Sequence, residues 1–485
     1  MTLLTLLICS PLFVILLLSF LSSAPTHTKK TAVILGSIIP VLLSFWVWKE
    51  FRSGETLWFS SEWITFGAEP SFTISFDIAV NGFSVLMLVL TTVLTCLSLM
   101  TAALQVTEKF LHYAMLTFAL ELGVIGVFAA QNLVLFFIFL EVTLLPMFLL
   151  IAKWGGAHKE KAAYSYLLYN GIGSAFLLLS ITLVLAQAGT TSYDVLKVTS
   201  LEPGTELLVL CFMLIAFAVK LPIVPLHTWM VRVHVEAPPA LVMIHAGVLL
   251  KIAAYGLVQF GIGLFPTSFD KIALILAILG LVNVLYGALI AFVQKEIRAV
   301  FAYSSISHMG LVLLGAAVMN EAGVQGAIFH SISHGLIAAL VFFLIGTLLK
   351  RTGTTQLQHL SGLARSMPLF AGVFLAAGLA SLGLPGMSGF VGEFMTFLGV
   401  FKDMPVLGGI GVIGIILAAV YILRVVLDVT FGKDSSNIAT ADLQHGEWVP
   451  VTVLLAGILL MGLIPDVVTG QLDPVLKAIF IRIGG

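Results

Sequence analysis

About fourteen apolar stretches, each long enough to cross a bilayer as a helix, dominate this sequence. The hydrocarbon core of a bilayer is about 30 Å thick, so a crossing helix needs about 20 mainly apolar residues. No other segment is long and polar enough to form a soluble domain. The pattern therefore predicts an all-α integral membrane protein. The stretches cover approximately residues 2–22, 31–48, 79–101, 111–129, 131–152, 163–188, 206–227, 239–262, 272–293, 299–318, 326–349, 367–400, 408–431 and 448–465.

The composition supports this assignment and excludes other classes of protein. Hydrophobic residues make up 60% of the chain and charged residues only 10%, against about 45–50% and about 25% in soluble domains. A net charge of −1 gives no electrostatic case for nucleic-acid binding. The cysteines Cys9, Cys96 and Cys211 are far apart, and the sequence has no CxxC motif or His/Cys cluster. We therefore expect no metal site and no cofactor in this chain.

Basic residues are unevenly distributed between the connections on the two sides of the predicted bundle. We number the connections in chain order, starting from the one after the first predicted helix. Of the 23 Lys and Arg residues, 13 fall in the odd-numbered connections, and 7 fall in the even-numbered connections and the C-terminal tail. Because basic residues are retained on the cytoplasmic side, we expect both termini on the non-cytoplasmic side of a bacterial cell membrane. No basic segment precedes the first apolar stretch, which predicts a retained helix rather than a signal peptide.

Two of the predicted helices are interrupted. The seventh contains Pro222 and Pro225, and the twelfth contains Pro385 and Gly386. Such breaks survive in hydrocarbon only where protein or a water-filled cavity satisfies the freed backbone groups. Each break falls in the fourth helix of a five-helix block, which indicates two internal repeats and an ion path near mid-membrane. We expect four regions: N-terminal helices in 1–110, a first repeat in 111–265, a second repeat in 266–435, and a C-terminal helix with its tail in 436–485.

Ionisable side chains inside the predicted helices are costly and are therefore functional candidates. Glu141 and Lys220 form the first candidate pair. A carboxylate whose distance from a buried lysine can change alters the proton affinity of that lysine, as a pump requires. Glu141 could also be only a structural cap or a helix–helix hydrogen bond. Lys251 is a second isolated lysine one helix later, and Glu393 follows the second break.

Three histidines lie between Lys251 and Glu393 in the sequence. His330 and His334 are four residues apart and share a helix face, while His308 lies on the preceding helix. Histidine titrates near neutral pH, which suits a proton relay, although a single buried histidine is more often a hydrogen-bonded core residue. Metal binding is not favoured, because no acidic or thiol ligand lies at a suitable sequence spacing.

The remaining candidates receive less specific expectations. Arg424 and Asp428 are four residues apart and are expected to form a local ion pair, although the arginine could also meet water. Glu121 could join the region of the fifth-helix glutamate or face a neighbouring subunit. His227 and His245 flank the first break and could line water.

Five motifs together resemble the antiporter-like subunits of respiratory complex I, the NADH-quinone oxidoreductase. They read AFAVKLPIVPLHTW, AGVLLKIAAYGL, QKEIRAVFAYSSISHMG, HSISHGLIAALVFF and LPGMSGFVGEF. The resemblance extends from about the third to the thirteenth helix, and the motifs are specific in combination. It implies a fourteen-helix fold with two inverted five-helix repeats, a broken helix in each, and two half-channels joined by a central charged axis.

The resemblance also implies roles for individual residues. Glutamate at position 393 is typical of the M type of subunit, whereas the N and L types and the Mrp cation/proton antiporters typically carry lysine there. Two segments depart from the family pattern: MVRVHVEAPPALVMIHAG is less acidic than usual, which leaves water access there open, and Asn81-Gly82 stands in place of Asp-Gly. Glu141 and Lys220 match the glutamate of the fifth helix and the lysine of the seventh helix, which form a switching pair in the family. Lys251 matches the central lysine, and His308 and His334 match the connecting relay. Glu393 matches the terminal residue on the twelfth helix.

These inferences predict a proton-translocating membrane subunit of a complex I-type enzyme, driven by quinone reduction in partner subunits. The expected partners are the lipid bilayer and the other membrane subunits of that complex, including other antiporter-like ones, with NADH or another donor bound elsewhere. The alternatives are an Mrp-type cation/proton antiporter subunit or a membrane subunit of a proton-pumping hydrogenase complex. A structural scaffold would not explain two buried lysines beside two broken helices. The electron donor, the quinone, the choice of H⁺ or Na⁺ and the order of proton loading are left open.

Overall fold

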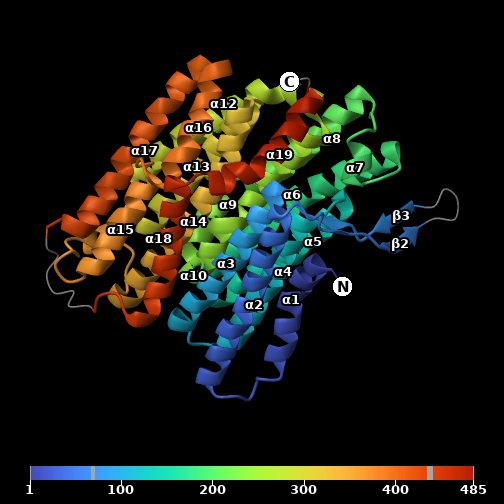
Figure 1. The fold of residues 1–485 in the computed structure, drawn as a ribbon. Coiled ribbons are helices and arrows are strands. Elements are labelled where there is room, and N and C mark those ends of the chain that lie inside the picture. The colour runs from blue at the N-terminus through green and yellow to red at the C-terminus, as the bar shows by residue number, and fades with distance from the viewer. Residues whose placement is uncertain (1, 67–71, 434–440, 484–485) are drawn as a thin grey trace.

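The computed structural model describes residues 2–66, 72–433 and 441–483, and these residues are mostly helical (Figure 1). In this part of the chain, twelve helices are long and apolar enough to cross a membrane. The 17-residue helix α1 (Leu3–Ser19) and the broken pair α15 (Pro368–Ser381) and α16 (Ser388–Asp403) occupy the two other predicted positions. The prediction of an all-α membrane protein with about fourteen crossing units is therefore confirmed.

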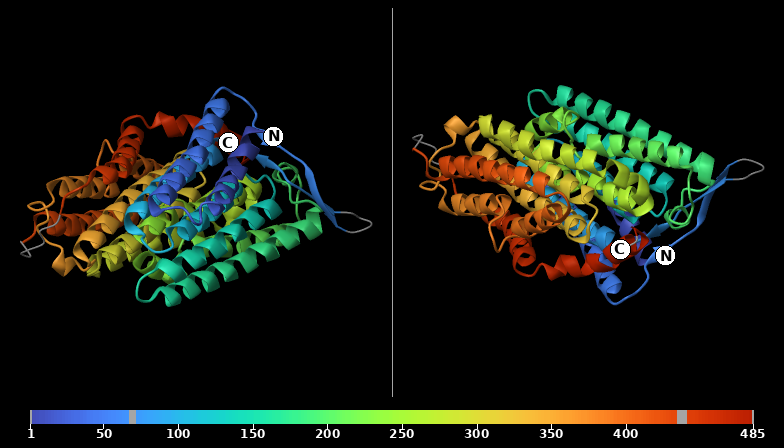
Figure 2. Two further views of the ribbon diagram at one scale, coloured as in Figure 1. Left: turned by 90° about the horizontal axis from the view of Figure 1, so that it is seen from below. Right: turned by 90° about the horizontal axis from the view of Figure 1, so that it is seen from above.

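The N-terminal region consists of α1, α2 (Thr26–Arg52) and α3 (Gly82–Gln105). Between α2 and α3, a segment predicted only as a polar connection contains four short strands. These are β1 (Trp58–Phe59), β2 (Glu62–Phe66), β3 (Phe72–Ser75) and β4 (Ile78–Ala79), which pair antiparallel as β1–β4 and β2–β3. The β2–β3 pair projects from the edge of the helical bundle (Figures 1 and 2).

Two groups of five crossing units follow. Because five is an odd number, the second group enters the membrane from the opposite side to the first, which makes the repeats inverted. The first group is α4 (Phe110–Ala129), α5 (Leu133–Trp154), α6 (Lys159–Ala188), the broken pair α8 (Pro203–Lys220) and α9 (Thr228–Glu236), and the unit α10 (Pro239–Ile244), η1 (His245–Leu249), α11 (Lys251–Gly256) and η2 (Leu257–Ile262). The second group is α12 (Pro266–Val293), α13 (Ile297–Ala317), α14 (Glu321–Thr352), the broken pair α15 and α16, and α17 (Pro405–Phe431).

Short elements and a C-terminal pair of helices complete the described chain. Helix α18 (Trp448–Leu463) is the fourteenth crossing unit, and α19 (Asp466–Ile483) is an additional helix where we expected only a tail. Helix α19 packs against α3 so closely that a side chain at Gly82 would collide with the Gln471 carbonyl. The short elements are α7 (Tyr193–Leu196), η3 (Leu357–His359) and η4 (His445–Glu447).

Both predicted helix breaks are present. Helix α8 ends at Lys220 and α9 begins at Thr228, so the two prolines of the first break lie between them. In the second break, Gly383 and Gly386 adopt φ values of 76° and 91°, a left-handed conformation that glycine tolerates and other residues rarely adopt. Each break therefore follows from residues that cannot continue a helix.

Helix α14 runs through the middle of the bundle (Figure 1) and brings the two repeats together. It contacts α10, η1 and α11 of the first repeat and α13, α15 and α16 of its own. Figure 2 shows α6 (cyan-green) and α17 (orange) towards opposite sides of the bundle, with the other helices between them. Side chains on α14 can therefore connect groups from both repeats.

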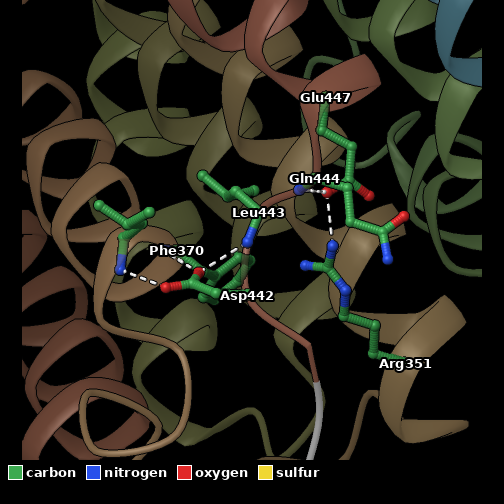
Figure 3. A network of polar contacts seen from close by, with 7 residues as sticks. Arg351, Phe370, Asp442, Leu443, Gln444 and Glu447 are labelled. Carbon is green, nitrogen blue, oxygen red and sulfur yellow. Dashed lines mark hydrogen bonds and ion pairs between the residues drawn. The ribbon is translucent and has the colours of Figure 1, made fainter.

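A buried ion pair fixes the segment that enters α18 (Figure 3). Arg351, at the end of α14, lies 2.5 Å from Glu447, and both side chains are more than nine-tenths buried. Glu447 also accepts a hydrogen bond from the Gln444 backbone at 2.8 Å. Close by, Asp442 accepts hydrogen bonds from the backbone N–H groups of Phe370 and Leu443. These contacts join the C-terminal region to α14 and α15.

Replacing Arg351 with methionine should destabilise the chain by about 3–5 kcal/mol, because Glu447 would remain buried without its cationic partner. The double substitution Arg351→Met/Glu447→Leu should recover most of that loss, since both charges are then removed. Denaturation of the purified protein in detergent, followed by circular dichroism, measures both effects. Equal midpoints for the single variant and the parent would show that the pair does not stabilise the fold.

Candidate functional site

Lys251 lies at the centre of the bundle and is completely buried. It follows the π-helical turn η1, a distortion common at functional sites, and its ammonium group donates to the Ala246 carbonyl in that turn. The Lys251 Nζ atom also lies 2.8 Å from Nδ1 of His334 on α14. The predicted central lysine and one predicted relay histidine are thus in direct contact, and the contact joins the two repeats.

The two predicted relay histidines, His308 and His334, form one cluster with His330 between α13 and α14. The ring centroids of His308 and His334 lie 5.2 Å apart, and those of His308 and His330 also lie 5.2 Å apart. The rings of His330 and His334 are 6.4 Å apart on successive turns of α14. All three side chains are buried. The structure therefore brings together the histidines that sequence spacing could only place on neighbouring helices.

Glu393 lies at the far end of this cluster. Its Oε1 atom is 3.6 Å from Nδ1 of His308, and both side chains are more than nine-tenths buried. This distance exceeds a direct hydrogen bond, so proton transfer across it requires a small side-chain movement or one bridging water. The other carboxylate oxygen faces Gly383 in the helix break, where a side chain would approach it to 2.5 Å. Glu393 therefore connects the histidines to the break between α15 and α16.

The same cluster has a possible metal-ligand geometry that sequence spacing does not reveal. One ligand atom each from His308, His330 and Glu393 lies within 4.8 Å of the others. The carboxylate comes from α16, far along the chain from the histidines. Spacing along the sequence places no acidic ligand beside the histidines, but packing brings the Glu393 carboxylate next to them in space. The ring nitrogens of His308 and His330 make no hydrogen bond to another described residue.

Glu141 and Lys220 are not directly paired in this structure. Lys220 donates to Asn170 Oδ1 at 3.1 Å, and the Ser174 hydroxyl donates to Glu141. Asn170 and Ser174 are one turn apart on α6, so this helix lies between the predicted partners. Glu141 remains within electrostatic range of Lys220. Sequence analysis missed both α6 residues, because neutral polar side chains give little signal within an apolar helix.

A pair of histidines lies between Lys220 and Lys251. His234 Nε2 and His245 Nδ1 are 2.9 Å apart, and both rings are buried. A small cavity of about 10 Å³ adjoins this pair. It is lined by Lys220, Asn170 and His245. This volume is about the minimum needed for one water molecule. His245 thus fits the expected water-lining position, and its partner His234 lies in the segment that departs from the family pattern.

Two other candidates, His227 and Glu121, lie away from the lysines and histidines described above. His227 is buried beside the rings of Tyr286 and Tyr303 in the first break. Glu121 does not face a neighbouring subunit, because it is only 1% exposed. The other expectation, that Glu121 joins the region of Glu141, stays a prediction.

The predicted Arg424–Asp428 ion pair is wrong. Arg424 instead donates to the Phe292 carbonyl on α12, and its guanidinium lies 5.3 Å from the centre of the Phe292 ring. Packing of α17 against α12 offers a carbonyl and an aromatic face together. The long arginine side chain therefore contacts the neighbouring helix rather than the carboxylate one turn away.

An inverted-repeat bundle with two broken helices and a buried series of lysine, histidine and glutamate side chains defines an antiporter-like membrane subunit. Residues 130–418 match the family described as NADH:quinone oxidoreductase/Mrp antiporter, transmembrane region. The chain belongs to this family, and the recognition made from its motifs is confirmed.

Individual relatives and one solved structure agree with this assignment. NAD(P)H-quinone oxidoreductase chain 4 2 of Thermosynechococcus vestitus is 40% identical, with 86% of this chain and 80% of the relative covered. NADH-quinone oxidoreductase subunit M of Rickettsia conorii is 34% identical, with 94% and 93% covered. A chain of the structure titled "Respiratory complex I from Thermus thermophilus with bound NADH" has 28% identity and a TM-score of 0.89, covering 99% of this chain and 100% of that one.

Proposed function

We propose that this chain is an M-type, proton-translocating membrane subunit of a complex I-type NADH-quinone oxidoreductase. The observation that carries the proposal is a series of ionisable groups across both repeats, all of them buried except the half-buried Glu141. We call this series the polar axis. Its members, in spatial order, are Glu141, Lys220, His245, Lys251, His334, His308 and Glu393.

The spacing of the axis suits stepwise proton movement. Moving one charge across the membrane costs about 2.3 kcal/mol per 100 mV of potential, so several short steps are easier than one long step. Lys251 and His334 are within hydrogen-bond distance. A water in the small cavity beside Lys220 would bridge the gap there, and a short side-chain movement would close the 3.6 Å gap between His308 and Glu393. Quinone reduction in partner subunits would drive the proton-affinity changes at the Glu141–Lys220 end.

The proposal also covers the enzyme activity of the complex, the partner subunits and the membrane location of this chain. The enzyme activity belongs to the assembled complex, and electron transfer takes place in partner subunits, so this chain itself needs no cofactor. Partners include other membrane subunits of the complex, among them other antiporter-like ones. The excess of basic residues in the odd-numbered connections supports a bacterial cell-membrane location with both termini on the non-cytoplasmic side.

An Mrp-type cation/proton antiporter subunit is the second candidate, because the matched family includes both kinds of protein. Glu393 favours the complex I assignment, since the resemblance implies lysine at this position in Mrp subunits. Neighbouring genes for quinone-site subunits would support the first candidate, and a set of small Mrp-type genes would support the second.

The substitution Glu141→Gln tests the proposed function. The side-chain shape is nearly unchanged and Ser174 can still hydrogen-bond to the amide oxygen, so the complex should assemble. Proton pumping should fall by about tenfold or more, because loss of proton transfer by a positioned side chain typically costs at least 10²-fold and a partial bypass through water remains. Pumping is measured as acidification of inverted membrane vesicles during quinone reduction.

The matched control is Glu160→Gln, an exposed carboxylate in the first turn of α6. This control should pump at the parental rate. Normal pumping by Glu141→Gln at equal assembly would remove Glu141 from the polar axis.

A further inference from the structure

Two adjoining hollows lie where the odd-numbered connections meet, away from the polar axis. The larger one has a volume of about 480 Å³, and the smaller one, of about 310 Å³, shares Glu236 with it. They are formed by the ends of α3, α5, α9 and α14 and the starts of α6, α10 and α13. Their basic lining residues are Lys153, Lys159, Lys161, Arg232, Arg298 and Lys350, against the two acidic residues Glu108 and Glu236.

The positive charge of these hollows is only partly balanced in the described part of the chain, because Glu236 and Glu296 lie within electrostatic range of Arg298 but the basic lining residues outnumber the acidic ones. Ion pairs found there involve other residues, and none joins the six basic side chains to a carboxylate. The Glu236 carboxylate instead accepts a hydrogen bond from the His158 backbone at 2.9 Å. Lys159 and Arg232 donate to neutral oxygens, the Lys153 carbonyl and the Ser165 hydroxyl. The hollows therefore attract an anion.

Arg298 makes this attraction specific. It is only 8% exposed, it lines the larger hollow, and it donates to the Val235 carbonyl through one terminal nitrogen. Its Nε atom has no hydrogen-bond partner among the described residues. A guanidinium with free donors in a buried position matches the oxygen geometry of a phosphate group.

The surroundings of the smaller hollow indicate where the phosphate comes from. Lys161 lines this hollow, and Tyr164 and Leu168 follow it at helical spacings of three and seven residues on α6. Both of these apolar side chains are largely exposed. A charged group followed by exposed apolar side chains along one helix face matches a lipid headgroup followed by its acyl chains. Basic pockets between transmembrane helices commonly bind anionic headgroups.

We propose that these two hollows bind the phosphate-bearing headgroup of an anionic membrane phospholipid, held by Lys161, Arg232 and Arg298. The acyl chains then lie along the outer face of α6. This site is separate from the polar axis and does not depend on the proposed function. Bound lipid would fix the connections between α5 and α6 and between α9 and α10 relative to each other.

Native mass spectrometry of the delipidated full chain tests the proposal, with phosphatidylglycerol as the anionic probe and phosphatidylcholine of the same acyl chains as the neutral one. The parent should bind phosphatidylglycerol more tightly than phosphatidylcholine. The double variant Lys161→Gln/Arg232→Gln should weaken phosphatidylglycerol binding on the order of 30-fold, the effect of removing two basic residues near a membrane surface. Both side chains are exposed, so the fold should survive.

The control is the double variant Lys271→Gln/Lys402→Gln, which removes the same charge from exposed positions on the even-numbered connections. It should bind phosphatidylglycerol as the parent does. Equal binding of the two lipids by the parent, or unchanged binding in Lys161→Gln/Arg232→Gln, would overturn the proposal. Binding of inorganic phosphate without binding of phosphatidylglycerol would overturn the lipid source, whereas displacement of bound lipid by excess phosphate would support recognition of the headgroup.

Discussion

A Lys251→Met variant should assemble normally and translocate protons on the order of 100-fold more slowly than the parent, the usual effect of removing one positioned proton-transfer group. Lys251 is the only lysine in direct contact with the relay among the described residues, through its 2.8 Å contact with His334. Methionine has a similar length and no charge to desolvate, so the buried site should remain filled without a cavity. Proton uptake by inverted vesicles during quinone reduction measures the rate.

A second substitution separates proton transfer from fixed charge. In Lys251→Arg the positive charge is retained, but a guanidinium does not release its proton in proteins. The variant should therefore also lose pumping, provided that the complex assembles to the parental level on native gels. Pumping at the parental rate in Lys251→Arg would mean that Lys251 acts only as a fixed charge. Parental pumping in Lys251→Met would remove Lys251 from the polar axis altogether.

The outline of the fold could be predicted because it depends on local physical requirements. Each crossing unit needs a long apolar run, and each break needs residues that cannot continue a helix, as at Pro222 and Gly386. These signals are visible in any single sequence. Helix α19 and the strands β1–β4 were missed because their segments mix polar and apolar residues. The close approach of α19 to Gly82, which fixes that helix, has no local signature.

The candidate site was predicted by residue type more than by contact. Ionisable residues in apolar helices identified Lys251, His308, His334 and Glu393, and packing brings all four together. The sequence predicts that Glu141 pairs with Lys220, but in the structure the two side chains are not in direct contact. Polar residues of α6 intervene, and sequence alone cannot reveal which face of a neighbouring helix fills a gap.

Arg424 on α17 is a second case in which sequence spacing did not predict the contact that a side chain makes. A spacing of four residues between Arg424 and Asp428 favours an ion pair in an isolated helix, where the contribution is about 0.2–0.5 kcal/mol. The Phe292 carbonyl and ring compete successfully once α12 packs alongside. Local spacing rules therefore fail where packing brings another partner within reach of the side chain.

Glu393→Gln should block proton passage at the end of the polar axis and reduce pumping on the order of 100-fold, as expected for loss of a positioned proton-transfer group. The amide keeps the size of the side chain and its packing against Gly383, so assembly should be normal. It cannot exchange a proton with His308, which faces the Oε1 position at 3.6 Å. Pumping coupled to quinone reduction is compared in membranes with equal amounts of each variant.

Two further variants at this position show what the site requires. Glu393→Asp keeps the carboxylate but withdraws it by one methylene from His308, so pumping should be partly retained. Glu393→Lys should also function in part if the position needs only a titratable group, as the lysine of related subunits implies. Parental pumping by Glu393→Gln would instead make Glu393 structural. The axis would then have to end earlier, within the histidine cluster, at His308 or at His334, which contacts Lys251 directly.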